Sequence, residues 1–433
     1  MKRLAGLALL IKLISMVAAL GTSVVLARML DTDGFGLYSL CISVAAISVV
    51  FLSGGLPTLT VREYAKTAYS DNRGKVAQFR SFSYLWMLAL GVLVAAVLYV
   101  VFHYTTLIST EINGIFVQVI TLIILNTVII YFGSEIRAFD LTTASQIPNL
   151  LIRPVLFIVL LYAVGFFGFQ IDLLSALQLY NLSMVVAVVV SILILCGIRA
   201  HPFMIKFVAL GQYKAWAKVA LPLMASSAFV VATQNLDTIM LGILSTNHEI
   251  ALYKVSFQLA GLIIIGMNVV NLITIRNFSS FFDKMEMRRF EEIAKKSTLY
   301  CIILSVPFAI VFVFLGRPIL SLLFGEEYGA ASMILAVLAI AQLINASFGI
   351  VGAILNITGH ERMTLKGVAI AFVINGVLNA VLIGPYGAQG AAISTLVATL
   401  TWNVLLYRAV RNKLDIETLP YLPYRQISKS GEE

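Results

Sequence analysis

The chain has 433 residues, of which 60% are hydrophobic and only 12% are charged. An average soluble domain carries about 25% charged residues, so this composition excludes a water-soluble globule and indicates a polytopic helical membrane protein. The net charge of +9 does not indicate a nucleic-acid partner, because most of the 30 Lys and Arg fall in loops on one side of the predicted membrane spans. This asymmetry follows the positive-inside rule and predicts that both termini are cytoplasmic.

The stretch from Ile11 to Glu63 predicts a membrane helical hairpin. Two apolar runs, each long enough to cross a hydrocarbon core of ~30 Å, flank the polar turn DTDGFG. Charge lies within the hairpin, with Lys12 inside the first run and Arg28 at its end. The basic start MKRLAGLALL is not followed by a small-residue cleavage site, so we expect a retained first helix and not a signal peptide.

Hydropathy predicts an all-α integral membrane protein with about twelve transmembrane helices. The loops after even-numbered spans are basic, whereas the loops on the other side are short, so we expect no extramembrane domain. The predicted spans are 7–29, 36–56, 82–103, 115–136, 148–168, 174–197, 219–244, 251–275, 298–315, 330–356, 364–383 and 389–408.

Two pairs of similar segments predict that the chain contains a parallel repeat. GLYSL resembles ALYKV, and FGFQIDLLSALQLYNLS resembles YGAQGAAISTLVATLTWN, with both pairs displaced by about half the chain. Parallel repeats are a known transporter architecture, so we expect two six-helix bundles, related by a pseudo-repeat, around a central cavity. The expected parts are an N-terminal bundle at 1–197, a cytoplasmic interfacial linker at 198–218, a C-terminal bundle at 219–408 and a cytoplasmic tail at 409–433.

Patterns typical of catalytic or metal-binding proteins are missing from the sequence. The four His stand alone, and there is no glycine-rich phosphate loop with a Walker lysine. The three cysteines, Cys41, Cys196 and Cys301, lie in or beside apolar runs and are expected to be packed thiols. A membrane polymerase, ligase or acyltransferase would need clustered intramembrane charges or a large outer loop. We therefore expect no enzyme, no cofactor and no metal site.

A sparse set of intramembrane charges remains. Asp237 lies well inside the seventh predicted span, where a charge costs at least ~2.5–3.5 kcal/mol, and Gln234 and Asn235 precede it. We expect these residues to couple transport to H⁺ or Na⁺, with a structural ion pair as the alternative. Arg28, at the outer end of the first span, is expected to face a cavity, because the positive-inside rule disfavours Arg there.

The other charged residues lie towards the ends of the predicted spans. Lys12 lies near the cytoplasmic end of its span and can extend its ammonium group to the interface. Lys254 and Arg153 lie at predicted span edges, where anchors are commoner than ligands. Glu135, Arg137 and Asp140 close the fourth span, and Arg137 and Asp140 are three positions apart and could pair on one helical face.

Several motifs resemble the Wzx-type polysaccharide flippases of the multidrug/oligosaccharidyl-lipid/polysaccharide exporter superfamily. In the opening hairpin, LARML and GLYSL are followed by GLPTLTVRE. Residues 237–242, DTIMLG, match the family's D-x-x-M-L-G element, and Tyr253 matches a following G-x-Y element in which Ala251 replaces the glycine. RAFDLTTASQIPNLLIRP and GPYGAQGAAIST are also similar to that family.

The resemblance implies a flippase that moves an undecaprenyl-diphosphate-linked oligosaccharide to the periplasmic leaflet of the bacterial inner membrane by ion-coupled alternating access. The pathway would be O-antigen (lipopolysaccharide), capsule or exopolysaccharide synthesis. Arg28 and Lys12 are the expected phosphate contacts, and Asp237, with Gln234 and Asn235, is the expected ion-coupling group. Implied partners are membrane lipids, the lipid-linked oligosaccharide, a polysaccharide polymerase and chain-length regulator proteins. The alternatives are a cation-coupled multidrug antiporter and a membrane glycan polymerase or ligase.

Overall fold

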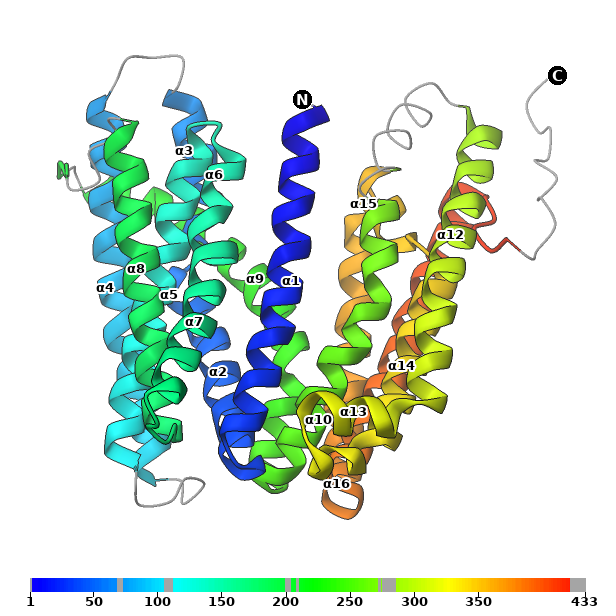
Figure 1. Ribbon diagram of the computed structural model, residues 1–433. Helices are drawn as coiled ribbons and strands as arrows, with labels where there is room; N and C mark the ends of the chain where they lie inside the picture. The colour runs from blue at the N-terminus through cyan, green and yellow to red at the C-terminus, as the bar shows by residue number, and fades with distance from the viewer. Residues whose placement is uncertain are drawn as a thin grey trace, which may run out of the picture. The chain divides into compact units, whose positions relative to one another are not determined.

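The described part of the chain is built from helices (Figure 1). The computed structural model describes residues 2–67, 73–104, 112–198, 204–207, 210–271, 274 and 286–420. Within these residues no strand occurs, so the predicted all-α class is confirmed. Parts of the predicted linker, of the basic loop before the ninth span and of the C-terminal tail lie outside the described residues, at 199–203, 208–209, 275–285 and 421–433.

The membrane spans follow the predicted pattern. Eleven helical stretches of the described chain are long and apolar enough to cross a bilayer. The longest, α16 (Glu361–Leu414), has 54 residues and consists of two helices joined at Gly387, whose backbone is not helical (φ 53°, ψ −132°). The eleventh and twelfth predicted spans both lie in α16, and the turn between them falls in the GPYG segment where the sequence placed it. The polytopic membrane fold is confirmed.

The chain divides into two compact units, Met1–Ile239 (the N-terminal unit) and Met240–Glu433 (the C-terminal unit). The division falls inside α9 (Leu210–Leu244), a continuous helix that includes the last nine residues of the predicted linker and the seventh predicted span. The predicted bundle boundaries, the repeat and the central cavity stay predictions.

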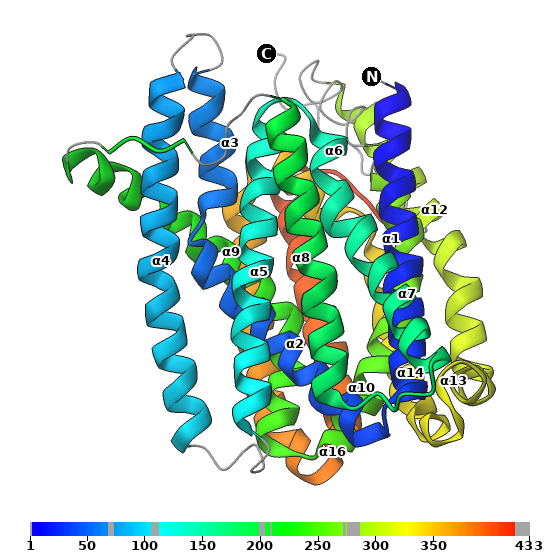
Figure 2. The same ribbon diagram turned by 60° about the vertical axis from the view of Figure 1, so that its left-hand side comes forward.

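The N-terminal unit is organised around α5, which packs against α2, α3, α4 and α8 and lies beside α8 in both views (Figure 2). Its buried core includes Phe79, Phe82, Tyr131, Phe132 and Trp216. Besides the N-terminal part of α9, the helices of the unit are α1 (Lys2–Met29), α2 (Thr32–Ser53), α3 (Leu56–Thr67), α4 (Arg73–Tyr104), α5 (Ile112–Ala138), α6 (Thr142–Gln146), a π-helix (Ile147–Ile152), α7 (Arg153–Phe166) and α8 (Leu173–Gly197).

Local sequence explains several boundaries in this unit. Gly54 and Gly55 separate α2 from α3 with φ of 53° and 75°, which only glycine adopts readily. A side chain at Gly55 would collide with the backbone of α9 at Ala220, so the glycine also permits α9 to pack closely. At α8, Asp172 and Ser175 form a reciprocal capping box. The Ser175 hydroxyl and N–H that bond the Asp172 carboxylate hold the pKa of that carboxyl below its ordinary value.

The first two turns of α9 pack against α4. Trp216 is only 8% exposed, and its ring centroid lies 5.2 Å from that of Phe79 and 5.4 Å from that of Phe82. Its indole Nε1 donates a 3.3 Å hydrogen bond to Glu63 of α3, and Tyr213 stacks on Phe82. The start of α9 therefore has protein partners within the N-terminal unit.

The C-terminal unit is organised around α14, which packs against α10, α12 and α16. Its main core includes Phe290, Cys301, Ile354, Leu355 and Val410. Cys301 and Cys41 are buried, whereas Cys196 is exposed, so the expectation of packed thiols is wrong for Cys196. Besides α16 and the end of α9, the helices of the C-terminal unit are α10 (Asn247–Ala260), a 3-10 helix (Gly261–Ile264), α12 (Met287–Phe314), α13 (Gly316–Phe324), a 3-10 helix (Glu326–Ala331), α14 (Ser332–Phe348) and α15 (Val351–Ile357).

Candidate functional site

Arg153 lies in the middle of a membrane-spanning segment. The helical stretch Thr142–Phe166 forms one candidate span made of α6, the π-helix and α7. At 1.5 Å per residue, Arg153 is about 16 Å from Thr142 and about 20 Å from Phe166. The expected position of Arg153 at a span edge is wrong for this stretch, because the helix begins at Thr142 and continues through Pro148, the first residue of the predicted span.

Two prolines account for the irregular helix beside Arg153. Pro148 and Pro154 lack the N–H that an α-helix uses; Pro148 is the second residue of the π-helix Ile147–Ile152, and Pro154 follows it in α7. A π-helical turn widens the helix and is frequent at functional sites. Asn149 belongs to this turn, and its side-chain oxygen is buried without a hydrogen-bond partner in the described structure. The span therefore combines a charge and an amide at an irregular turn.

The Arg153 guanidinium is only partly satisfied. Its central carbon lies 5.6 Å from the ring centroid of Tyr180 on α8, within the range of a cation–π interaction. Its Nε is buried and has no hydrogen-bond partner, and among the described residues no carboxylate forms an ion pair with it. Arginine carries five N–H donors, so most of its bonding capacity is available to a ligand.

Aromatic rings hold Tyr180 in place beneath this cation. The ring of Phe157, one turn after Arg153 on α7, meets Tyr180 edge-on at 5.0 Å. Tyr38 of α2 meets the same ring edge-on at 6.3 Å. These packed contacts fix the aromatic face that the guanidinium covers, so the arginine is positioned by three helices.

Further polar groups lie on helices that pack around the π-helix. The side-chain oxygens of Asn126 on α5 and Asn181 on α8 are buried and lack partners in the described structure. The amide nitrogen of Asn181 donates to the side-chain oxygen of Gln118 at 2.8 Å. Since α5, α8 and the π-helix pack against one another, the unit's interior offers both donors and acceptors. Such groups suit a ligand with an anion and hydroxyls.

Arg80, a buried arginine of the same unit, is fully partnered, in contrast to the half-buried Arg153. Arg80 of α4 and Glu135 of α5 are 1% and 0% exposed, with Arg80 Nε 2.8 Å and Nη2 3.2 Å from the two carboxylate oxygens. The hydroxyls of Tyr64 and Tyr131 also donate to Glu135, at 2.5 Å and 3.0 Å. The sequence placed Glu135 beside Arg137, and no local spacing indicated a partner 55 positions away.

The two predicted phosphate contacts do not form one site. Lys12 and Arg28 are both exposed and lie on the single helix α1. Helix geometry places them about 24 Å apart along the axis and roughly 160° apart around it. One diphosphate cannot contact both side chains at once, so any roles they have are sequential.

The predicted ion-coupling residues share α9 but differ in environment. Asp237 is buried, at 6% exposed, whereas Gln234 is exposed. The amide nitrogen of Asn235 donates to the backbone oxygen of Val231 at 2.9 Å. Within the described part of the chain, no cluster of His, Cys, Asp or Glu suits a metal ion. Ion coupling by these residues stays a prediction.

Comparison with known proteins gives matches over most of the chain. The profile of a family described as polysaccharide biosynthesis protein matches residues 3–275, and the MatE profile matches residues 222–381. The probable low-salt glycan biosynthesis flippase Agl15 of Haloferax volcanii is 23% identical over 170 residues, covering 39% of this chain and 36% of that protein. The probable flippase AglR of the same organism is 27% identical over 188 residues, covering 43% and 39%.

A capsular polysaccharide biosynthesis protein, CapF of Staphylococcus aureus, is 23% identical over 201 residues, covering 46% of this chain and 50% of that protein. The aligned part therefore spans half or less of each of these curated relatives.

Two solved structures show the same fold. An inward-facing multidrug resistance transporter of the MATE family has a TM-score of 0.74 at 13% identity, covering 95% of this chain and 98% of that one. The lipid II flippase MurJ has a TM-score of 0.72 at 13% identity, covering 93% and 87%. At this identity the likeness establishes the transporter fold and leaves the substrate to be argued from the chain itself.

Proposed function

Because the chain belongs to the polysaccharide biosynthesis protein family, we propose that it is a flippase for undecaprenyl-diphosphate-linked oligosaccharide. It moves this lipid from the cytoplasmic to the periplasmic leaflet of the bacterial inner membrane, with both termini in the cytoplasm. The flippase names of two relatives and the fold shared with MurJ support this proposal.

The observation that carries the proposal is Arg153, a cation near the middle of a candidate membrane span whose Nε has no partner in the described structure. A charge within a membrane span that has no carboxylate partner is costly, and function is the default explanation for such a residue. Guanidinium groups suit phosphate oxygens because they donate two parallel hydrogen bonds. A diphosphate is the anion that a lipid-linked oligosaccharide would bring to it.

Three cations of the N-terminal unit lie at different depths under the predicted orientation. Lys12 is nearest the cytoplasm, Arg153 is central, and Arg28 is at the outer end of α1. Helix α1 packs against both the π-helix and α7, so these cations lie on adjoining elements. We propose that the diphosphate passes them in this order while the prenyl chain stays in lipid.

Ion coupling is assigned to Asp237, with Gln234 and Asn235 as polar neighbours. A buried carboxylate can drive a conformational cycle if its proton or Na⁺ is bound more tightly in one state than in the other. Polymerase and chain-length regulator proteins would use the translocated glycan.

The multidrug antiporter is the second candidate, on the strength of the MatE profile and the MATE structure. An organic cation requires an acidic interior, for which Asp237 is the buried candidate of the N-terminal unit, whereas Arg153 of the same unit would repel it. A polymerase or ligase, the third candidate, differs in changing the covalent structure of the glycan.

The proposal is tested in proteoliposomes that carry a lipid-linked oligosaccharide in one leaflet. A membrane-impermeant glycosidase added outside reports arrival of the glycan, and mass spectrometry reports its structure. We expect protein-dependent arrival with unchanged mass. A lengthened or transferred glycan would identify an enzyme, and uptake of a lipophilic cation without glycan movement would identify an antiporter.

A further inference from the structure

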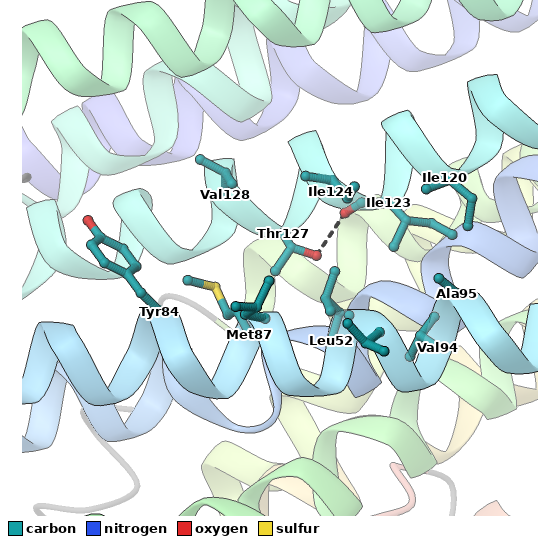
Figure 3. A pocket seen from close by; sticks show the side chains of 13 residues that line it. Leu52, Tyr84, Met87, Val94, Ala95, Ile120, Ile123, Ile124, Thr127 and Val128 are labelled. Atoms are coloured by element: carbon teal, nitrogen blue, oxygen red, sulfur yellow. Dashed lines mark hydrogen bonds between the residues drawn. The ribbon is translucent and has the colours of Figure 1, made fainter.

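An apolar groove runs between α4 and α5 on the N-terminal unit (Figure 3). Its volume is about 420 Å³. Met87, Gly91 and Ala95 line it from α4, and Ile120, Ile124 and Val128 line it from α5. Gly91 leaves room for Leu52 of α2, which forms the floor, because a side chain on Gly91 would lie 3.2 Å from Leu52.

The groove has no polar group that needs a partner. Thr127, one of its few polar residues, donates its hydroxyl to the backbone oxygen of Ile123 at 2.8 Å, as the dashed line in Figure 3 shows. Leu88 and Val92, which also line it, are each 66% exposed and leave the groove open to the bilayer. A hydrocarbon chain can fill this space, whereas water or a sugar would find no hydrogen bonds there.

The length of the groove matches one leaflet. From Tyr84 at one end to Ala95 at the other, α4 rises about 16 Å, which is about half of a ~30 Å hydrocarbon core. The start of α4 is the basic, cytoplasmic end under the positive-inside rule, so Tyr84 marks the inner boundary of the hydrocarbon. The groove therefore lies in the cytoplasmic leaflet.

A short segment of the linker, residues 204–207, crosses α4 near Tyr84, at the cytoplasmic end of the groove. The Lys206 N–H donates to the Ala77 oxygen at 3.1 Å, and the Ser81 hydroxyl donates to the Lys206 oxygen at 2.9 Å. Arg80 Nη1 reaches the Met204 oxygen at 3.4 Å. By helix periodicity, Ala77, Ser81 and Tyr84 share the face of α4 that carries the groove.

The exposed side chains of this segment suit a membrane surface. Met204 and Phe207 are exposed apolar side chains on either side of the exposed cation Lys206. A basic residue flanked by apolar ones is typical of a segment that lies among anionic headgroups. Apolar space and positive charge thus lie end to end along one helix face.

We propose that this groove and segment 204–207 bind one anionic phospholipid of the cytoplasmic leaflet. One acyl chain fills the groove from Tyr84 towards Ala95, and the phosphate lies at Lys206. A phospholipid fits better than the prenyl chain of the proposed substrate, because the groove is one leaflet long and a prenyl chain is several times longer. The inference rests on the groove and the linker, and does not depend on the flippase proposal.

The chain-binding part is tested by filling the groove. Phosphatidylglycerol is titrated into delipidated protein, and bound lipid is counted by native mass spectrometry. Ala95→Phe should weaken binding at least tenfold, because the ring occupies the space of the acyl chain. Ala96→Phe is the matched control: the neighbouring alanine is exposed and outside the groove, so binding should be unchanged. Ala95→Leu serves as a smaller filling variant if Ala95→Phe does not insert.

The charge part is tested by comparing phosphatidylglycerol with phosphatidylcholine. Lys206→Ala should reduce the preference for phosphatidylglycerol about fivefold, which corresponds to ~1 kcal/mol for one basic side chain near anionic lipid. Lys75→Ala is the control, since Lys75 is exposed on α4 but lies roughly 180° around the helix from Tyr84.

If the groove-filling variant (Ala95→Phe, or Ala95→Leu in its place) binds lipid as well as the control Ala96→Phe, the groove assignment is overturned. Retention of a polyprenyl lipid in place of phosphatidylglycerol would assign the groove to the substrate chain and also overturn the proposal. Equal affinity of the native protein for phosphatidylglycerol and phosphatidylcholine would remove Lys206 from the site. Loss of flipping with normal lipid binding would concern only the transport function.

Discussion

Two arginines of the N-terminal unit lie in candidate membrane spans under opposite conditions. Arg80 meets a carboxylate with two of its nitrogens and a backbone oxygen with a third, and two tyrosines complete the bonding of Glu135. Arg153 has the face of Tyr180 and a buried, unbonded Nε. The two arginines therefore differ both in burial and in the extent of their bonding.

The contrast has an energetic basis. Removing one partner of a buried ion pair leaves the other charge buried and unpaired, which lowers the stability of the folded protein by about 3–5 kcal/mol. An under-bonded cation contributes no such stability, since its desolvation is uncompensated until a ligand arrives. The Arg80–Glu135 cluster should therefore respond to mutation in folding, and Arg153 should respond in transport.

The largest effect is expected at Glu135. Glu135→Ala leaves Arg80 buried and unpaired, so we expect a loss of about 3–5 kcal/mol and a clear fall in the melting temperature of the purified protein. Arg137→Ala, at the same end of α5 but exposed, is the control and should be close to neutral. A double variant, Arg80→Met with Glu135→Leu, should recover part of the loss, and its failure to do so would argue against a simple pair.

Arg153 should give the reverse result. Arg153→Met keeps the stem and removes the charge, so the melting temperature should stay at or above that of the native protein while flipping falls about 10- to 100-fold, which corresponds to ~1.5–3 kcal/mol for a charged hydrogen bond. Arg153→Lys should keep part of the activity, because the charge remains without the bidentate fork. Arg62→Met, an exposed change of the same kind on α3, is the control. Unfolding of Arg153→Met would erase the contrast with Arg80.

Asp237 extends the comparison to a buried acid. If it couples an ion to flipping, Asp237→Asn should give a stable protein whose flipping depends less on the H⁺ or Na⁺ gradient, and Asp237→Glu should be milder. Gradient-driven flipping in proteoliposomes and the melting temperature are measured on the same preparations. A lowered melting temperature with unchanged gradient dependence would place Asp237 with Glu135 as a structural group.

The smallest effects are expected for the exposed cations of α1. Arg28→Ala should slow flipping about fivefold, and Lys12→Ala should do so less, because solvent and lipid headgroups screen exposed charges. Arg28→Lys should lie between Arg28→Ala and the native protein. The measurement is the initial rate of glycan arrival at equal protein abundance. If both alanine variants move the glycan at the native rate, Arg28 and Lys12 are interfacial anchors only.

The sequence predicted the spans well because hydropathy is a local property. The twelve predicted segments coincide with described helices as far as the described residues extend, and the turn at Gly387 follows from GPYG. The prediction puts Arg153 near a span edge because it begins that span at Pro148. At Pro148 a π-helical turn accommodates the missing N–H, so the helix extends further back and carries Arg153 to its centre.

Long-range pairing could not be predicted from this one chain. Arg80 and Glu135 are 55 positions apart, and only the general rule that buried charges are paired pointed to a partner. The same holds for Trp216, which lies in the predicted interfacial linker and whose ring packs on Phe79 and Phe82. Local patterns place a side chain along a helix, and packing decides which neighbour satisfies it.

The central claim is that Arg153 binds the phosphates of the substrate, and lipid binding tests it most directly. The affinities of purified protein for undecaprenyl diphosphate and for uncharged undecaprenol are compared in detergent. The native protein and Arg62→Met should prefer the diphosphate about 10- to 100-fold, since a charged hydrogen bond contributes ~1.5–3 kcal/mol. Arg153→Met should lose most of that preference and keep its affinity for undecaprenol. An unchanged preference in stable Arg153→Met protein would contradict the account.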